Sequence, residues 1–295
     1  MPAMNNMERR MKKRHLLASA LALAFYGSAA VASDITITTG GKGGSYNTTG
    51  EKLAEMLRGF DHTVTVERSA GSVENINRVA SGEATLGFTQ LDALAWWMNR
   101  NPSPTGKSPV KVLGNLFSEC VYIAVNRDGP IGDEDDLQSD KGKIAVQKQG
   151  SGSAVTWEYM RELEPGYGES TVVFEGGMQT LAQLAAEPDG AINAFMWVSN
   201  PNSLDQRYLQ TVLGNDALEL IDVDDKDLND KYEPLGRAIY RFEEPEVAKG
   251  LIFDQEIETI CMDAVVIATP NADDETLDDM ADIMLNQRSV LLGQD

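Results

Sequence analysis

The sequence predicts an α/β protein of two lobes with a ligand cleft between them. Strand-like runs alternate with amphipathic helical stretches along most of the chain, a pattern typical of sheets with parallel strands. Two longer apolar runs, residues 120–125 and 261–269, are candidates for strands that cross between the lobes. We therefore expect lobe one to hold residues 33–124 and 262–295, and lobe two to hold residues 125–261.

Residues 1–32 have the pattern of a secretory signal peptide. A basic cluster within residues 9–14 precedes an apolar run over residues 16–26, and Ala30 and Ala32 satisfy the small-residue rule for cleavage. The apolar run is shorter than the ~20 residues of a membrane-spanning helix. We therefore expect cleavage after Ala32 and a soluble protein outside the cytoplasm.

Local patterns place the elements of both lobes in order. Helical spacing of Val73, Ile76 and Val79 predicts a helix that Ser72 can cap. Short β-like runs predict the strands, and apolar residues at helical spacing predict the other helices. Predicted strands lie at residues 35–39, 64–68, 85–88, 143–146 and 191–197, and predicted helices follow residues 46, 72, 90 and 153, with a last helix around Leu277, Met280, Ile283 and Met284.

The charge balance argues against nucleic acid and anionic membranes as partners. The chain has 46 acidic and 25 basic residues, which gives a net charge of −21. Such a chain repels phosphate backbones and anionic lipid surfaces. We expect the acidic runs at residues 222–227 and 273–279 to be solvated faces.

The two cysteines lie in the two candidate crossing strands. An exported protein can keep a disulfide, so Cys120 and Cys261 are a candidate pair. Two separately buried thiols fit the sequence equally well, because the pattern gives no distance between them.

Three turns rich in glycine and serine each follow a strand-like run and open a helix, at residues 40–46, 69–72 and 149–153. Glycine allows the backbone to approach a ligand, and the first N–H groups of a helix have no partner within the helix. Each turn can therefore hold a carboxylate or a phosphate. Together they predict a protein that binds a small anion.

The candidate ligand contacts come from these turns and from the strand ends beside them. Ser151 and Ser153 have the strongest pattern, because the paired glycines free the backbone and both hydroxyls can point at one anion. For Lys42 the alternative is a solvated loop lysine, and for Ser72 it is an ordinary helix cap. Asp92 fits a first-turn helix acid better than a ligand contact. The predicted contacts are Lys42, Gly43, Gly44, Ser45, Tyr46, Ser72, Asn75, Gln90, Ser151, Gly152, Ser153 and Trp197.

The sequence offers little for catalysis. Beyond the predicted leader it has one histidine, His62, which we expect to be an exposed loop residue. A histidine-assisted nucleophile, a G-x-S-x-G elbow and a His/Cys metal site cannot be assembled from this inventory. The glycine turns also fail the spacing rules for nucleotide binding. We therefore predict no catalytic residue, no metal and no cofactor.

The chain resembles the TAXI family of solute receptors, which serve the tripartite ATP-independent periplasmic (TRAP) transporters. The resemblance is carried by residues 35–46, 69–75, 82–90 and 150–153, which occur in the family's order. It implies a type II periplasmic-binding fold whose lobes close on a ligand in the periplasm. It also implies a monomer that delivers its ligand to a sodium-driven permease.

The ligands that this resemblance implies are small carboxylates, including glutamate, glutamine and 2-oxoglutarate. Lys42 stands where the family usually has a small or hydroxyl residue, and Asn193 stands where an acid is common. The identity of the ligand therefore cannot be carried over. Two alternatives share the fold: an enzyme with a pair of poised side chains in the cleft, and a sensory receptor that signals to a membrane kinase.

Overall fold

The computed structural model describes residues 33–104, 106–202, 206–232, 236–248 and 255–294. The predicted signal peptide lies outside these residues. None of the described helices is long and apolar enough to cross a membrane.

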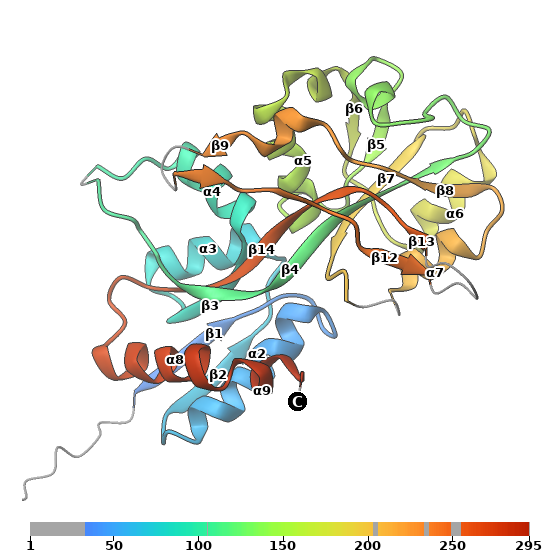
Figure 1. Cartoon of the computed structure of the whole chain (residues 1–295). Coiled ribbons are helices and arrows are strands. Elements are labelled where there is room, and N and C mark those ends of the chain that lie inside the picture. The colour runs from blue at the N-terminus through green and yellow to red at the C-terminus, as the bar shows by residue number, and fades with distance from the viewer. Residues whose placement is uncertain (1–32, 105, 203–205, 233–235, 249–254, 295) are drawn as a thin grey trace, which may run out of the picture.

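One sheet runs through both lobes and contains ten strands of the described chain, in the order β2-β1-β3-β14-β4-β7-β5-β6 (Figure 1). β11 pairs with β14, β8 pairs with β4, and two short ribbons, β9–β10 and β12–β13, lie apart. The strands are β1 (Asp34–Thr38), β2 (Thr63–Glu67), β3 (Leu86–Gln90), β4 (Lys111–Asn126), β5 (Lys143–Ala145), β6 (Thr171–Val173), β7 (Ala194–Ser199), β8 (Leu218–Ile221), β9 (Lys231–Tyr232), β10 (Arg237–Ala238), β11 (Arg241–Glu243), β12 (Glu246–Ala248), β13 (Gln255–Glu256) and β14 (Thr259–Ala268).

Helices cover both faces of the sheet in each lobe. In lobe one, α2, α8 and α9 share a hydrophobic cluster on one face, while α3 and α4 pack on the other. In lobe two, α5 packs on one face, and α6 and α7 pack on the other. The α-helices are α2 (Ser45–Arg58), α3 (Ser72–Ser81), α4 (Leu91–Arg100), α5 (Gly152–Leu163), α6 (Met178–Ala186), α7 (Arg207–Leu213), α8 (Asp274–Asn286) and α9 (Arg288–Leu292), and the 3₁₀ helices are η1 (Asp135–Gln138), η2 (Pro165–Glu169) and η3 (Lys226–Asn229).

The predicted two-lobed α/β fold is confirmed. The long antiparallel strands β4 and β14 run through the middle of the molecule and join the lobes (Figure 1). The proposed lobe boundaries at residues 124 and 262 fall inside these two strands. Because both strands belong to both lobes, the division at these residues stays a proposal.

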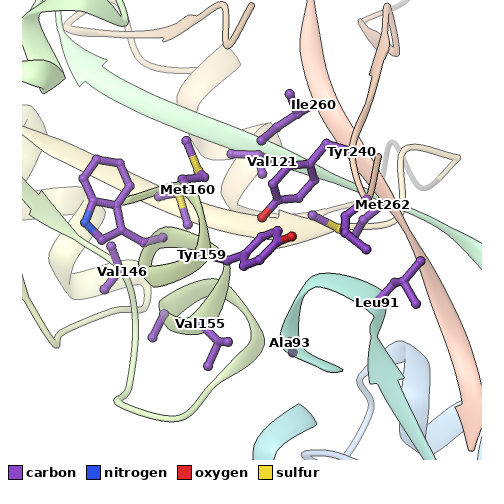
Figure 2. Packing of buried hydrophobic residues seen from close by; sticks show 14 of the residues in the cluster. Leu91, Ala93, Val121, Val146, Val155, Tyr159, Met160, Tyr240, Ile260 and Met262 are labelled. Carbon is purple, nitrogen blue, oxygen red and sulfur yellow. The ribbon is translucent and has the colours of Figure 1, made fainter. Parts of the chain in front are cut away.

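A continuous hydrophobic core extends across the junction of the lobes. Figure 2 shows Leu91 of α4 on one side and Met160 of α5 on the other, with Val121 of β4 and Met262 of β14 between them. These side chains are at most 4% exposed. The two lobes therefore share buried side-chain contacts on this side of β4 and β14.

A polar link crosses the same junction. Asp92 of α4 is fully buried, and its Oδ2 accepts hydrogen bonds from Thr156 Oγ1 (2.6 Å) and Tyr240 Oη (2.8 Å). Burial raises the pKa of the Asp92 carboxyl, and these hydrogen bonds lower it. Asp92 does lie in the first turn of its helix, but its main partners belong to other elements.

Cys120 and Cys261 form a disulfide between β4 and β14, which resolves the two alternatives that the sequence left open. The two residues lie opposite each other in the strand register, with a Cα–Cα distance of 4.0 Å. Both are fully buried. The disulfide therefore ties the two strands together where they pass between the lobes.

The prediction that His62 is an exposed loop residue is wrong. His62 is 4% exposed, its Nε2 lies 2.7 Å from Asp279 Oδ2 of α8, and its Nδ1 accepts a hydrogen bond from the Ser33 N–H. The loop between α2 and β2 is covered by a helix from the far end of the chain. The acidic run of α8 is thus not purely a solvated face, because Asp279 pairs with His62 and Asp273 caps the helix by accepting from the N–H of Thr276.

Candidate functional site

A hollow of about 300 Å³ lies between the two lobes. Lobe one contributes the turns after β1 and β2 and the end of β3, lobe two contributes the turn before α5 and the end of β7, and β4 contributes one residue. The lining residues are Gly40, Gly41, Gly44, Ser45, Tyr46, Gly71, Ser72, Gln90, Glu119, Gln147, Ser151, Gly152, Ser153, Val198 and Ser199.

Lobe one presents two helix N-termini to the hollow, and neither N-cap residue makes a side-chain hydrogen bond. Gly44 is the N-cap of α2, and Gly71 is the N-cap of α3. Gly71 has φ 136° and ψ −156°, a conformation that is essentially restricted to glycine. The first N–H groups of both helices are therefore open to an anion, where the positive end of the helix dipole favours it.

Lobe two presents one helix N-terminus, and its serines already make hydrogen bonds. Ser151 is the N-cap of α5, and its Oγ accepts from the N–H of Ala154 at 3.3 Å. Ser153 Oγ accepts from the N–H of Val198 (3.1 Å) and from Gln147 Nε2 (3.4 Å). Since these oxygens act as acceptors, their O–H groups are still available to donate to a ligand.

Gln90 brings the two lobes together at the hollow. Its Oε1 accepts from Ser72 Oγ in lobe one, and its Nε2 donates to Thr156 Oγ1 in lobe two, both at 3.4 Å. A Cβ at Gly152 would lie only 1.8 Å from Gln90 Oε1. Glycine is therefore required at this position for the side chain of Gln90 to approach the start of α5.

Glu119 is a lining residue that sequence reasoning missed. It lies on β4 between the lobes, is 9% exposed, and its Oε2 accepts a hydrogen bond from Tyr46 Oη at 2.9 Å. Burial raises the pKa of the Glu119 carboxyl to about 7, the hydrogen bond from Tyr46 lowers it, and the charge of Asp92 raises it. An acid next to a run of buried apolar residues in one strand is the signal that could have identified it.

The structure does not bring all the predicted contacts to the hollow. Lys42 and Gly43 are exposed in the turn before α2 and are not among the lining residues. Asn75 is fully buried behind the turns, where Nδ2 donates to the carbonyl of Phe88 and Oδ1 accepts from Thr38 Oγ1.

Trp197 is also outside the lining. It is 1% exposed, its ring stacks between Tyr122 and Phe195, and its Nε1 donates to Gln206 Oε1. The residue that follows it, Val198, reaches the hollow instead. Successive residues of a strand point to opposite faces, so an assignment that is one position off selects the wrong face.

Three solved structures illustrate the likeness to known folds. XAC2383 from Xanthomonas citri bound to ATP is 12% identical, with 89% of this chain and 88% of that chain covered and a TM-score of 0.53. The periplasmic aliphatic sulphonate binding protein SsuA from Escherichia coli is 14% identical, with 90% and 79% covered and a TM-score of 0.48. The GluR0 ligand-binding core in complex with L-glutamate is 12% identical, with 90% and 98% covered and a TM-score of 0.49. Of these scores the first alone exceeds 0.5, and at that identity it shows the shared fold.

The chain shares the two-lobed α/β fold of XAC2383, and its hollow lies between the two lobes. The chain matches the model of the NMT1-like family over residues 37–293, and it belongs to that family.

Proposed function

We propose that this protein is a periplasmic receptor that captures a small organic anion, a carboxylate or an amino acid such as glutamate or 2-oxoglutarate, and delivers it to a TRAP-type permease. It acts as a monomer and by binding, with no chemical step. The observation that carries the proposal is the convergence of three helix N-termini, those of α2, α3 and α5, on one hollow between the lobes.

The contacts that we propose are backbone N–H groups and hydroxyls rather than cations. No lysine, arginine or histidine occurs among the lining residues that the structure describes. Oriented N–H groups at helix N-termini bind anions without a counter-charge. The proposed contacts are Gly44, Ser45, Tyr46, Ser72, Gln90, Ser151, Gly152 and Ser153.

The experiment is a binding screen with the exported form of the protein. Thermal shift against C4 to C6 carboxylates and amino acids identifies ligands, and calorimetry then measures Kd. We expect at least one compound to raise Tm in proportion to the logarithm of its concentration, because a ligand that binds only the folded state stabilises it by mass action. No shift across the panel would contradict the proposal.

Delivery needs a separate assay. Uptake of the identified ligand into vesicles that contain a TRAP-type permease from the same organism should require the receptor and a sodium gradient. Turnover of the bound ligand by the purified protein would instead favour the enzyme alternative, and a neighbouring membrane kinase would favour the sensory one.

A further inference from the structure

Two buried glutamates differ in one respect that bears on the ligand. Glu119 and Glu134 each accept a hydrogen bond from a tyrosine, Tyr46 and Tyr167, and burial raises the pKa of each carboxyl to about 7. Within the described chain, their remaining contacts are not alike.

Glu134 has acceptor bonds on both of its carboxylate oxygens. Oε1 accepts from Tyr167, and Oε2 accepts from the backbone N–H groups of Asp224 (2.7 Å) and Asp225 (2.8 Å). Both oxygens of the Glu134 carboxylate are thus hydrogen-bonded within the protein. Buried carboxylates normally have their hydrogen bonds satisfied in this way.

Glu119 has a bond on one oxygen alone. Oε2 accepts from Tyr46, and Oε1 accepts no hydrogen bond from the described part of the chain. The side chain lines the hollow, and none of the other lining residues that the structure describes carries a positive charge. A carboxylate with one oxygen that lacks a hydrogen-bond donor repels an anionic group placed next to it. It favours a ligand group that donates a hydrogen bond and carries a positive charge.

The chain holds Glu119 in place from two sides. Tyr46 belongs to the first turn of α2, so its hydroxyl connects Glu119 to one of the open helix N-termini. The next residue, Cys120, is bonded to Cys261 and points into the core. The carboxylate is therefore preorganised beside the N–H groups that would hold an anion.

We propose that Glu119 accepts a hydrogen bond from an ammonium group of the ligand, so that the receptor selects a zwitterion, an amino acid, over the carboxylate that lacks the amine. The inference rests on the proposed function, because the ligand's carboxylate is taken to bind at the helix N-termini. It separates two compounds that the proposed function treats alike, glutamate and 2-oxoglutarate.

The test compares matched ligand pairs by calorimetry at about pH 8, above the pKa of about 7 to which burial raises the Glu119 carboxyl. The pairs are glutamate and glutarate, aspartate and succinate, leucine and 4-methylpentanoate, and phenylalanine and 3-phenylpropanoate, with 2-oxoglutarate added. We expect the wild type to bind the amine-bearing member of its preferred pair at least about tenfold more tightly than the deaminated acid. The reason is that only the amine can donate a charge-assisted hydrogen bond to Glu119. Glu119→Gln should reduce this preference to about threefold or less while the deaminated acid binds no more weakly.

Glu134→Gln is the matched control, because it changes a buried, tyrosine-bonded glutamate outside the hollow. It should keep the wild-type preference. A wild type without preference for the amine, or a preference that survives Glu119→Gln, would overturn the assignment of Glu119 and leave the proposed function standing. No binding by any pair would overturn both.

A pH series on the wild type tests the inference without any substitution. The titratable groups that act on Glu119 are Tyr46 of α2 and Asp92 of α4, and its partner on β14, Met262, is uncharged. Ionisation of Glu119 favours an ammonium and opposes a lone anion. Between about pH 6 and pH 8 the affinity for the amino acid should therefore rise while that for the deaminated acid falls, and parallel slopes would contradict the inference.

Discussion

The two lobes line the same hollow with helix N-termini that differ in their capping. In lobe one, Gly44 and Gly71 leave the first N–H groups of α2 and α3 without a side-chain cap. In lobe two, Ser151 caps α5 and Ser153 is bonded to Val198. Lobe one is thus the half with open N–H groups, whereas lobe two presents hydroxyls whose orientation is already set. We infer from this difference that lobe one supplies most of the attraction for an anion.

The largest expected effect on stability comes from the disulfide between β4 and β14, the strands that both lobes share. Replacing both Cys120 and Cys261 by alanine should lower the free energy of unfolding by about 2–5 kcal/mol, because the disulfide closes a long loop in the unfolded chain. Urea denaturation followed by circular dichroism measures the change. Since β4 and β14 belong to both lobes, we expect one transition to remain; two separate transitions would show that the disulfide is what couples the lobes.

The second prediction compares one buried asparagine in each lobe. Asn75 bonds Thr38 and the carbonyls of Thr39 and Phe88, and it therefore fixes the strand ends that carry the turns of lobe one. Asn75→Ala should cost roughly 2–3 kcal/mol of stability, because buried partners are left unsatisfied, and should also weaken ligand binding.

The matched variant in lobe two is Asn193→Ala. Asn193 bonds the N–H of Lys143 and the carbonyl of Lys141, neither of which lines the hollow. It should lower the midpoint of urea unfolding and leave Kd unchanged once the protein is folded. Equal losses of affinity in the two variants would show that Asn75 acts through general stability alone.

Local pattern was sufficient for the turns but not for the residues whose role depends on distant contacts. Glycine and serine at residues 40–46 and 149–153 predict helix starts because the physical requirement is contained in the turn itself. Glu119 faces the hollow because of the register between β4 and β14, whose residues are far apart in sequence. His62 is buried for the same kind of reason, because α8 returns from the end of the chain to cover it.

The predicted ligand contacts in the turns show what residue type alone does not determine. The sequence predicts that the hydroxyls of Ser151 and Ser153 can both point at one anion. In the structure, Ser151 Oγ caps its own helix and Ser153 Oγ accepts a hydrogen bond from the N–H of Val198 in β7. Lys42 is a predicted contact with a solvated loop lysine as its alternative, and the structure leaves it exposed and outside the lining. Residue type indicates which bonds a group can make, and the surrounding chain decides how many remain for a ligand.

The substitution with the smallest expected effect on stability tests most directly whether lobe one supplies the attraction for an anion. Gly44 has φ −76° and ψ 162°, the extended conformation of a good N-cap. A Cβ there would lie 3.3 Å from the carbonyl oxygen of Gly41, so an aspartate fits with a small shift of that turn. Gly44→Asp should raise the free energy of unfolding by roughly 0.5–1 kcal/mol through the cap and the helix dipole. It should also reduce affinity for the ligand at least about tenfold, since its carboxylate occupies the N–H groups and repels the anion.

Ser151→Ala performs the opposite change in lobe two. It removes the cap of α5 and should cost roughly 0.5–2 kcal/mol of stability, while the N–H of Ala154 becomes free for a ligand. If lobe one supplies the attraction, affinity falls far more in Gly44→Asp than in Ser151→Ala, although the first variant is the more stable protein. A stabilised Gly44→Asp variant that binds as tightly as the wild type would show that the ligand does not use the N-terminus of α2.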